Sequence, residues 1–119
     1  RWTSGPITID GRADEAAWQQ ATVIDKFGQA WDAKPGEMVP ARTATKVRLL
    51  WDASRLYFFA EMQDADLFAE LKEHDSATWT NDVFELFIKP AADKASYYEF
   101  QVTPLGTRLD MFIPERDPK

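Results

Sequence analysis

The sequence predicts an all-β fold, an antiparallel β-sandwich with one or two short helices. Apolar and polar residues alternate through several short stretches, which is the period of a half-buried strand. Turn-forming residues separate these stretches, as they do in a sheet built from hairpins. Helical periodicity is confined to brief segments, which favours strands as the main elements. With 119 residues, we expect one domain, spanning residues 1–119, with a single core.

The first part of the chain combines short strands with one helix. The expected elements are, in order, a strand at 6–9, a helix at 14–21, a strand at 23–27 and a loop at 28–43. Asp14 is placed to cap the helix, and Trp18 to fill one end of the core. Trp31 is the expected anchor of the loop, which contains several turn-forming residues.

The clearest hairpin joins residues 46–51 to residues 56–62. Its two segments alternate in hydrophobicity, and the polar residues 52–55 between them form a turn. Trp51 and Phe58 are expected in the core. We expect a helical turn over residues 64–71, capped by Asp64.

The second half reads as a meander of three strands at residues 83–89, 97–103 and 108–113. A turn between the first two would place Glu85 opposite or near Gln101, and Phe87 near Glu99. The apolar residues of the two strands then share the other face, as a sandwich core requires. The outer face would collect Glu85, Glu99, Gln101 and Lys89, with Trp79 at its end.

Composition excludes several classes of function. A net charge of −6 without any run of Lys and Arg argues against nucleic acid and anionic membrane surfaces. No apolar stretch is long enough to span a bilayer. The absence of cysteine excludes disulfides, thiolate nucleophiles and cysteine-based zinc sites.

Five segments, taken in order, resemble the family 9 carbohydrate-binding modules and their relatives. They are Ile9 to Trp18, Lys46 to Asp52, Leu56 to Phe58, the pattern of Trp79, Asp82 and Glu85, and Tyr97 to Val102 with the turn at Leu105 to Thr107. The resemblance covers nearly the whole chain, and the ordered set is more specific than any single segment.

The resemblance implies a β-sandwich without catalytic activity that binds an oligosaccharide or polysaccharide, beside extracellular glycoside hydrolases. It implies a secreted, periplasmic or cell-surface location and a structural calcium ion. A tryptophan in the position of Trp79 stacks on a sugar ring, and a glutamate in that of Glu85 bonds its hydroxyls. Gln101 stands where the sugar-binding modules carry an arginine. Their second stacking tryptophan would come after Lys119, so we expect this chain to lack the C-terminal part of the domain.

Each candidate ligand residue also has a structural interpretation. Trp79 could pack on a loop, and Glu85 could be a solvated charge of the outer face. Asp82 is expected to brace its loop more than to touch ligand. Together with Gln101 and Glu99, these residues form the predicted ligand-binding set. A flat indole suits the apolar face of a sugar, and planar polar groups beside it suit the hydroxyl edges. This match favours the binding interpretation.

Three alternatives concern metals, haem and catalysis. An acidic cluster lacks the spacing of a standard calcium loop, and its members are Asp64, Asp66, His74 and Asp75. A haem-binding electron-transfer domain of the related sandwich fold would draw its ligands from Met38, Met62, Met111 and His74. A glycosidase could use Glu85 and Glu99, although the sequence indicates neither a deep cleft nor a raised pKa.

Overall fold

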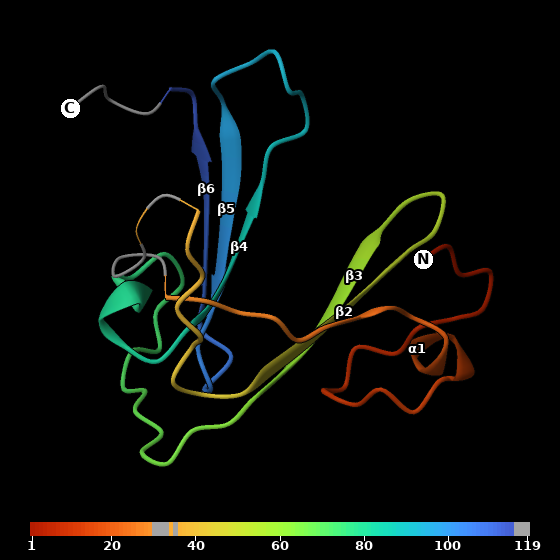
Figure 1. Ribbon diagram of the computed structural model, residues 1–119, viewed down its shortest axis with the longest axis horizontal. Coiled ribbons are helices and arrows are strands. Elements are labelled where there is room, and N and C mark those ends of the chain that lie inside the picture. Colours follow the sequence, from red (N-terminus) through yellow and green to blue (C-terminus); the bar gives the residue numbers. More distant parts are fainter. Residues whose placement is uncertain (30–33, 35, 116–119) are drawn as a thin grey trace. The chain divides into compact units, whose positions relative to one another are not determined.

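The protein is seen in a computed structural model that describes residues 1–29, 34 and 36–115. The chain forms two compact units, Arg1–Asp64 and Ala65–Lys119. Each unit holds one three-stranded antiparallel sheet, with the strand orders β1-β2-β3 and β4-β5-β6 (Figure 1). The prediction of an all-β fold with antiparallel sheets and little helix is confirmed. Within the described residues, no helix has the length and apolar character needed to cross a membrane.

The elements follow one another in a simple order. They are α1 (Ala16–Gln19), β1 (Val23–Ile24), β2 (Thr45–Trp51), β3 (Leu56–Met62), the 3₁₀ turn η1 (Thr78–Thr80), β4 (Phe84–Ile88), β5 (Tyr97–Val102) and β6 (Arg108–Ile113). The predicted hairpin and the three-strand meander are therefore confirmed, with boundaries shifted by a residue or two.

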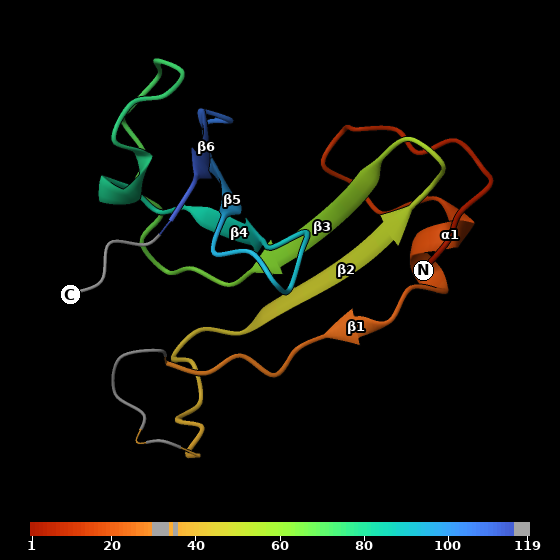
Figure 2. The same cartoon turned by 90° about the horizontal axis from the view of Figure 1, so that it is seen from above.

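In the first unit, β2 and β3 form the long hairpin, and β1 pairs along the other edge of β2 (Figure 2). The core lies on one face of this sheet. Leu50 is fully buried there against Trp18, Ala21 and Tyr57, so the expected role of Trp18 is confirmed. Apolar burial of this kind is the main stabilising term of a small unit.

Two residues predicted in the core are instead exposed. Trp51 and Phe58 lie on the opposite face of the hairpin from the cluster around Leu50 and Tyr57, because side chains alternate along each strand. Segment 56–62 is apolar on both faces, so alternation alone did not identify which face the Trp18 cluster covers.

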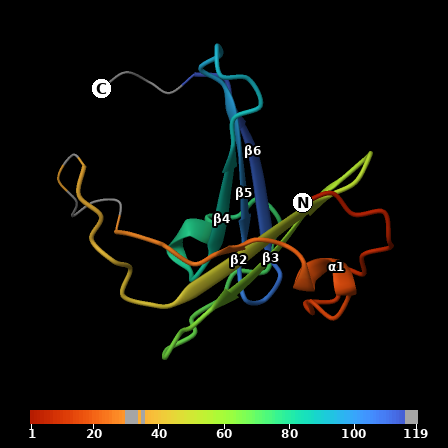
Figure 3. The ribbon, with the colours of Figure 1, turned by 45° about the vertical axis from the view of Figure 1, so that its right-hand side comes forward.

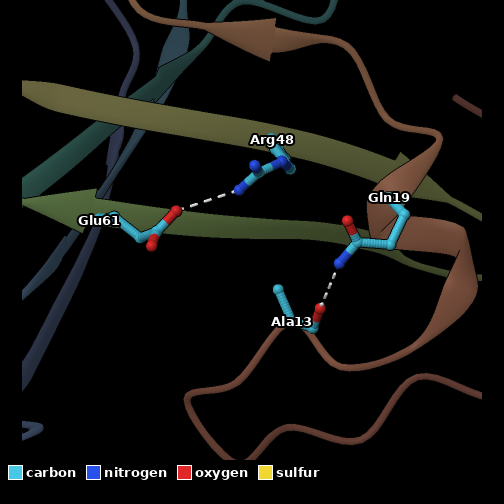
Figure 4. Close-up of polar contacts among 4 residues, drawn as sticks. All are labelled: Ala13, Gln19, Arg48 and Glu61. Atoms are coloured by element: carbon cyan, nitrogen blue, oxygen red, sulfur yellow. Dashed lines mark hydrogen bonds and ion pairs between the residues drawn. The ribbon is translucent and has the colours of Figure 1, made fainter.

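The face of the core also carries an ion pair between neighbouring strands. Arg48 lies opposite Phe59 in the register, so Glu61 is its diagonal neighbour, and the two charged groups meet at 3.1 Å (Figure 4). The same view shows Gln19 of α1 donating to the carbonyl oxygen of Ala13 at 3.4 Å. A cationic and an anionic side chain thus compensate each other on this sheet.

The turn between β2 and β3 is organised by one carboxylate. Asp52 Oδ1 accepts from the backbone N–H groups of Ser54 and Arg55, and Tyr57 donates its hydroxyl to Oδ2 at 2.7 Å. These donors, first the N–H of Ser54 and then the Tyr57 hydroxyl, lower the pKa of Asp52 to about 2.

In the second unit, β4, β5 and β6 run side by side (Figure 3). Glu85 pairs with Gln101 and Phe87 with Glu99, so the predicted register is confirmed. The turn from β5 to β6 is closed by Thr103, whose N–H donates to the carbonyl of Thr107 at 2.9 Å. Gly106 takes a φ of +81° in this turn, a conformation that glycine adopts without strain.

Two predicted elements are absent from the described residues, and each absence has a physical reason. Segment 6–9 is not a strand, and the N–H of Thr8 donates to the Glu15 carboxylate. Segment 64–71 is not helical, because side chains from residues 81 and 82 occupy backbone N–H groups of this segment. Trp31, the expected loop anchor, lies outside the described residues.

Candidate functional site

An exposed tryptophan stands on a short, well-anchored turn in the second unit. Trp79 is the middle residue of η1, and 59% of its surface is exposed. Its two neighbours hold the turn, since Thr80 donates its hydroxyl to the Ala77 carbonyl at 2.9 Å and Thr78 is completely buried. A large apolar ring is thereby presented to solvent on a backbone that is fixed on both sides.

A chain of hydrogen bonds connects this turn to β5. Thr78 donates its hydroxyl to Oε1 of Gln101 at 2.6 Å, and Gln101 donates from Nε2 to Oε1 of Glu99 at 2.6 Å. Gln101 is only 4% exposed, so its amide is held between these two partners. Buried polar groups that are hydrogen-bonded in this way fix the geometry around them.

Two carboxylates, Glu85 and Glu99, share one face of β4 and β5 with Gln101 and the exposed ring of Phe87, and we call this the polar face. Glu85 lies directly opposite Gln101, and Glu99 is the next residue along β5 on the same face. Partial burial, and secondarily the negative charge of Glu99, raises the pKa of Glu85 above its ordinary value. A raised pKa at Glu85 was not expected from the sequence.

The loop before η1 is held by two adjacent side chains. Asn81 accepts the N–H groups of Glu70 and Leu71 with one oxygen, at 3.0 and 3.1 Å. Asp82 accepts the N–H of Phe68 at 2.6 Å, while its own N–H donates to the Phe68 carbonyl at 2.9 Å. The bracing role expected of Asp82 is therefore observed, and its contact with ligand stays a prediction.

The structure brings most of the predicted ligand-binding residues into one region. Glu85, Glu99 and Gln101 lie on one sheet face, and the Thr78 hydrogen bond ties the Trp79 turn to that face. Thr78 itself was missed. A threonine beside a tryptophan has no distinctive signal in sequence, and its role depends on a partner 23 residues away.

The acidic cluster is assembled differently from the prediction. Among the described residues, the donors close enough to share a metal are His74, Asp75 and Asp110, whose ligand atoms lie within 4.8 Å of one another. Asp64 and Asp66 do not belong to this group. His74 Nδ1 lies 3.0 Å from Oδ2 of Asp75, and His74 Nε2 lies 3.5 Å from Oδ1 of Asp110. One imidazole and two exposed carboxylates do not suit calcium, which takes six or more oxygen ligands. The calcium and haem hypotheses stay predictions.

Residues 9–110 match the model of the family described as "Carbohydrate family 9 binding domain-like". The chain belongs to this family. The resemblance predicted from the five sequence segments is thus confirmed, and carbohydrate binding is the property for which the family is named.

Two curated relatives of this family 9-like chain are similar over 95 residues, or 80% of its length. Both carry the name "Endo-1,4-beta-xylanase A"; the protein from Thermotoga maritima is 35% identical and that from Thermotoga neapolitana 34%. The matched region spans only 8% of the length of each relative. No solved structure matches the chain significantly.

Proposed function

We propose that this family 9-like chain is a non-catalytic carbohydrate-binding module whose ligand lies against Trp79. The observation that carries the proposal is the exposed indole on a turn that is hydrogen-bonded to the polar face of β5. Sugar rings offer an apolar C–H face, which stacks on an indole, and hydroxyl groups, which bond carboxylates. Both kinds of group are available here within one unit of the chain.

The predicted ligand set then divides into contacts and supports. Glu85 and Glu99 offer oxygen acceptors to hydroxyl groups of the ligand. Gln101 already uses Oε1 and one donor of Nε2 inside the protein, so its main part is to hold Glu99. Asp82 supports the loop from residue 68.

The name of the relatives makes xylo-oligosaccharides the first ligands to test, with cello-oligosaccharides beside them. We expect Trp79→Ala to weaken binding by roughly thirtyfold, about 2 kcal/mol, as the loss of a stacking tryptophan does elsewhere. Isothermal titration calorimetry measures the affinity. Trp2→Ala is the matched control, because Trp2 is a similarly exposed tryptophan, at 55%, in the first unit.

Equal affinities of wild type and Trp79→Ala would remove Trp79 from the binding site.

A glycosidase is the second candidate, since a carboxyl group with a raised pKa next to a second carboxylate suits acid catalysis. A hydrolysis screen separates the two functions. Turnover that is lost in Glu85→Gln would replace the binding-module proposal with an enzymatic one.

We also propose that the module works outside the cytoplasm, beside a glycoside hydrolase, as its family membership suggests. Fractionation of the native host with an antibody against the module tests the location. Recovery of the protein solely in the cytoplasm would contradict it.

A further inference from the structure

One large apolar ring is exposed on the polar face. Phe87 lies two residues after Glu85 on β4, so its side chain points to the same side of the sheet. It is 56% exposed, which is close to the 59% of Trp79. On this face Glu85 precedes it, Glu99 lies opposite it and Lys89 follows it. Phe87 is therefore an exposed aromatic ring that stands among groups able to bond hydroxyls.

A tyrosine of the neighbouring strand supports this ring. Tyr97 of β5 is the diagonal neighbour of Phe87, and the two ring centroids lie 6.1 Å apart with 52° between the ring planes. Tyr97 is itself partly buried and pairs with Ile113 of β6, so the support extends across the sheet. A ring that is already held by a partner loses less side-chain freedom when a ligand binds to it.

The opposite face of the same sheet carries a similar aromatic pair in different surroundings. There Phe112 is 55% exposed, and its ring centroid lies 5.0 Å from that of Tyr98 on β5. The β4 residues of that face are all apolar, namely Phe84, Leu86 and Ile88. A continuous apolar face is typical of a surface that packs in a core. Phe87 lies instead between Glu85 and Lys89 on β4, so core packing does not account for a phenylalanine at this position.

The two exposed aromatic residues of the polar face lie at different levels along the strands. The hydrogen bond below the Trp79 turn ties that turn to the level of Gln101. Glu85 is opposite Gln101, and Phe87 is opposite Glu99, one step further along the same face. Since a strand rises about 3.3 Å per residue, such a step is about 7 Å long. A ligand that contacts both aromatic residues therefore spans at least two levels of the sheet.

We propose that Phe87 is a second stacking platform of the binding site, and that the ligand is an extended oligosaccharide, longer than a disaccharide, that lies along β4 from Trp79 to Phe87. The inference rests on the proposed function, because a sugar ring of the same ligand stacks on Trp79.

The polar groups around Phe87 suit such a ligand. Successive sugar units each offer an apolar C–H face and a hydroxyl edge, and the face of one unit stacks on the flat ring of Phe87. The acceptors of Glu85 and Glu99 lie between the two platforms, where they bond hydroxyls of consecutive units. Lys89 follows Phe87 on the same face and offers donors at the far end of the row.

The test is a series of linear xylo-oligosaccharides of increasing length, from two to six units, with the cello-oligosaccharide series beside it. Calorimetry measures each affinity. We expect the wild-type affinity to rise about tenfold from the shortest ligand to the longest, as a second aromatic contact would provide. Phe87→Leu keeps an apolar side chain but removes the flat ring, so it should bind the disaccharide like wild type and lose the rise.

A matched variant and a conservative one separate binding from structure. Phe112→Leu is the control, because Phe112 is equally exposed and also contacts a tyrosine of β5, but on the other face. It should keep the rise with length. Phe87→Tyr keeps a flat ring and should keep it too. Thermal melting shows that each variant is folded. A merely structural role of Phe87 predicts that Phe87→Leu melts at a lower temperature and keeps the rise, and this result would overturn the inference.

Failure of the inference is distinguishable from failure of the proposed function. Oligosaccharides that bind through Trp79 with the same affinity at every length would overturn the inference alone. A rise with length that persists in Phe87→Leu would do the same, because the added units would then bind elsewhere. Absence of binding to every sugar would overturn both.

Discussion

Two pairs of strands in this chain carry charged side chains at diagonal positions, with opposite charges in one pair and like charges in the other. On β2 and β3, Arg48 meets Glu61 at 3.1 Å, and the two charges compensate each other. On β4 and β5, Glu85 and Glu99 are diagonal neighbours on one face, and both are acidic. The first pair requires no ligand. Under the proposed function, the second pair lies on the sheet face that contacts the ligand.

The buried residues of the two units differ in the same sense. Those of the first unit are mainly apolar and include Trp18, Val47, Leu50 and Tyr57. Those of the second unit are mainly polar and include Thr78, Asn81, Gln101, Thr103 and Thr107. Apolar burial stabilises a fold, whereas paired buried polar groups fix positions at a modest net gain. The second unit therefore has fewer buried apolar residues than the first and a more defined arrangement of polar groups.

The largest effect should come from the apolar core of the first unit. Leu50→Ala removes a fully buried side chain and leaves a cavity, so we expect a loss of about 3 kcal/mol in the free energy of unfolding. Urea denaturation measures it, with Leu105→Ala as an exposed control. Affinity for oligosaccharide should be unchanged while the variant is folded. A loss of affinity would mean that the first sheet takes part in binding, and the contrast between the units would fail.

A smaller effect is expected from the buried hydroxyl below the Trp79 turn. Thr78→Val preserves the shape of the side chain but leaves Oε1 of Gln101 without its donor, at a cost of about 2 kcal/mol. The variant should also shift the fluorescence emission of Trp79 and weaken sugar binding. Thr78→Ser keeps the hydroxyl and should retain binding. If both variants bind as well as wild type, the hydrogen-bond chain does not position the site.

The smallest effects should appear in the pH dependence of stability, with opposite signs in the two units. The lowered pKa of Asp52 means that its stabilisation is present above its unfolded pKa and is lost as pH falls from about 4 to about 2. The raised pKa of Glu85 means that the folded chain binds this proton more tightly than the unfolded chain does. Stability from that group therefore rises as pH falls toward the ordinary range of glutamate.

Urea midpoints across both pH ranges, for wild type, Asp52→Ala and Glu85→Gln, resolve the two contributions. Asp52→Ala should flatten the loss of stability at low pH, and Glu85→Gln should flatten the loss of stability that occurs as pH rises above the ordinary range of glutamate. Contributions of the same sign would contradict the electrostatic difference between the two sheets.

The strands and their register could be predicted because alternation and turn residues are local signals. A one-residue slip of β4 against β5 would have put Phe84 and Leu86 on the polar face, so alternation excluded that pairing, and the turn length selected among pairings that differ by two residues. The buried face of the β2–β3 hairpin could not be predicted in the same way. Tyr57 and Phe58 are both aromatic neighbours, and which of them is buried depends on where Trp18 packs.

The exposed residues of the candidate site could be predicted from the sequence, but the residues that hold them in place could not. Trp79 and Glu85 follow a spacing that the family shares, so resemblance was sufficient to select them. Thr78 acts through Gln101, and Asn81 acts on the backbone of residues 70 and 71. Those hydrogen bonds join distant parts of the chain, and they also explain why segment 64–71 is not the helix that its own residues favour.

Mapping a bound oligosaccharide by NMR tests most directly the claim that the polar face beside Trp79 is the binding surface. The isotope-labelled protein is titrated with the ligand that calorimetry finds tightest. We expect the largest chemical-shift changes on the Trp79 indole N–H and on the backbone amides of Glu85, Glu99 and Gln101. Changes confined to β1, β2 and β3, with the Trp79 indole signal unmoved, would contradict it.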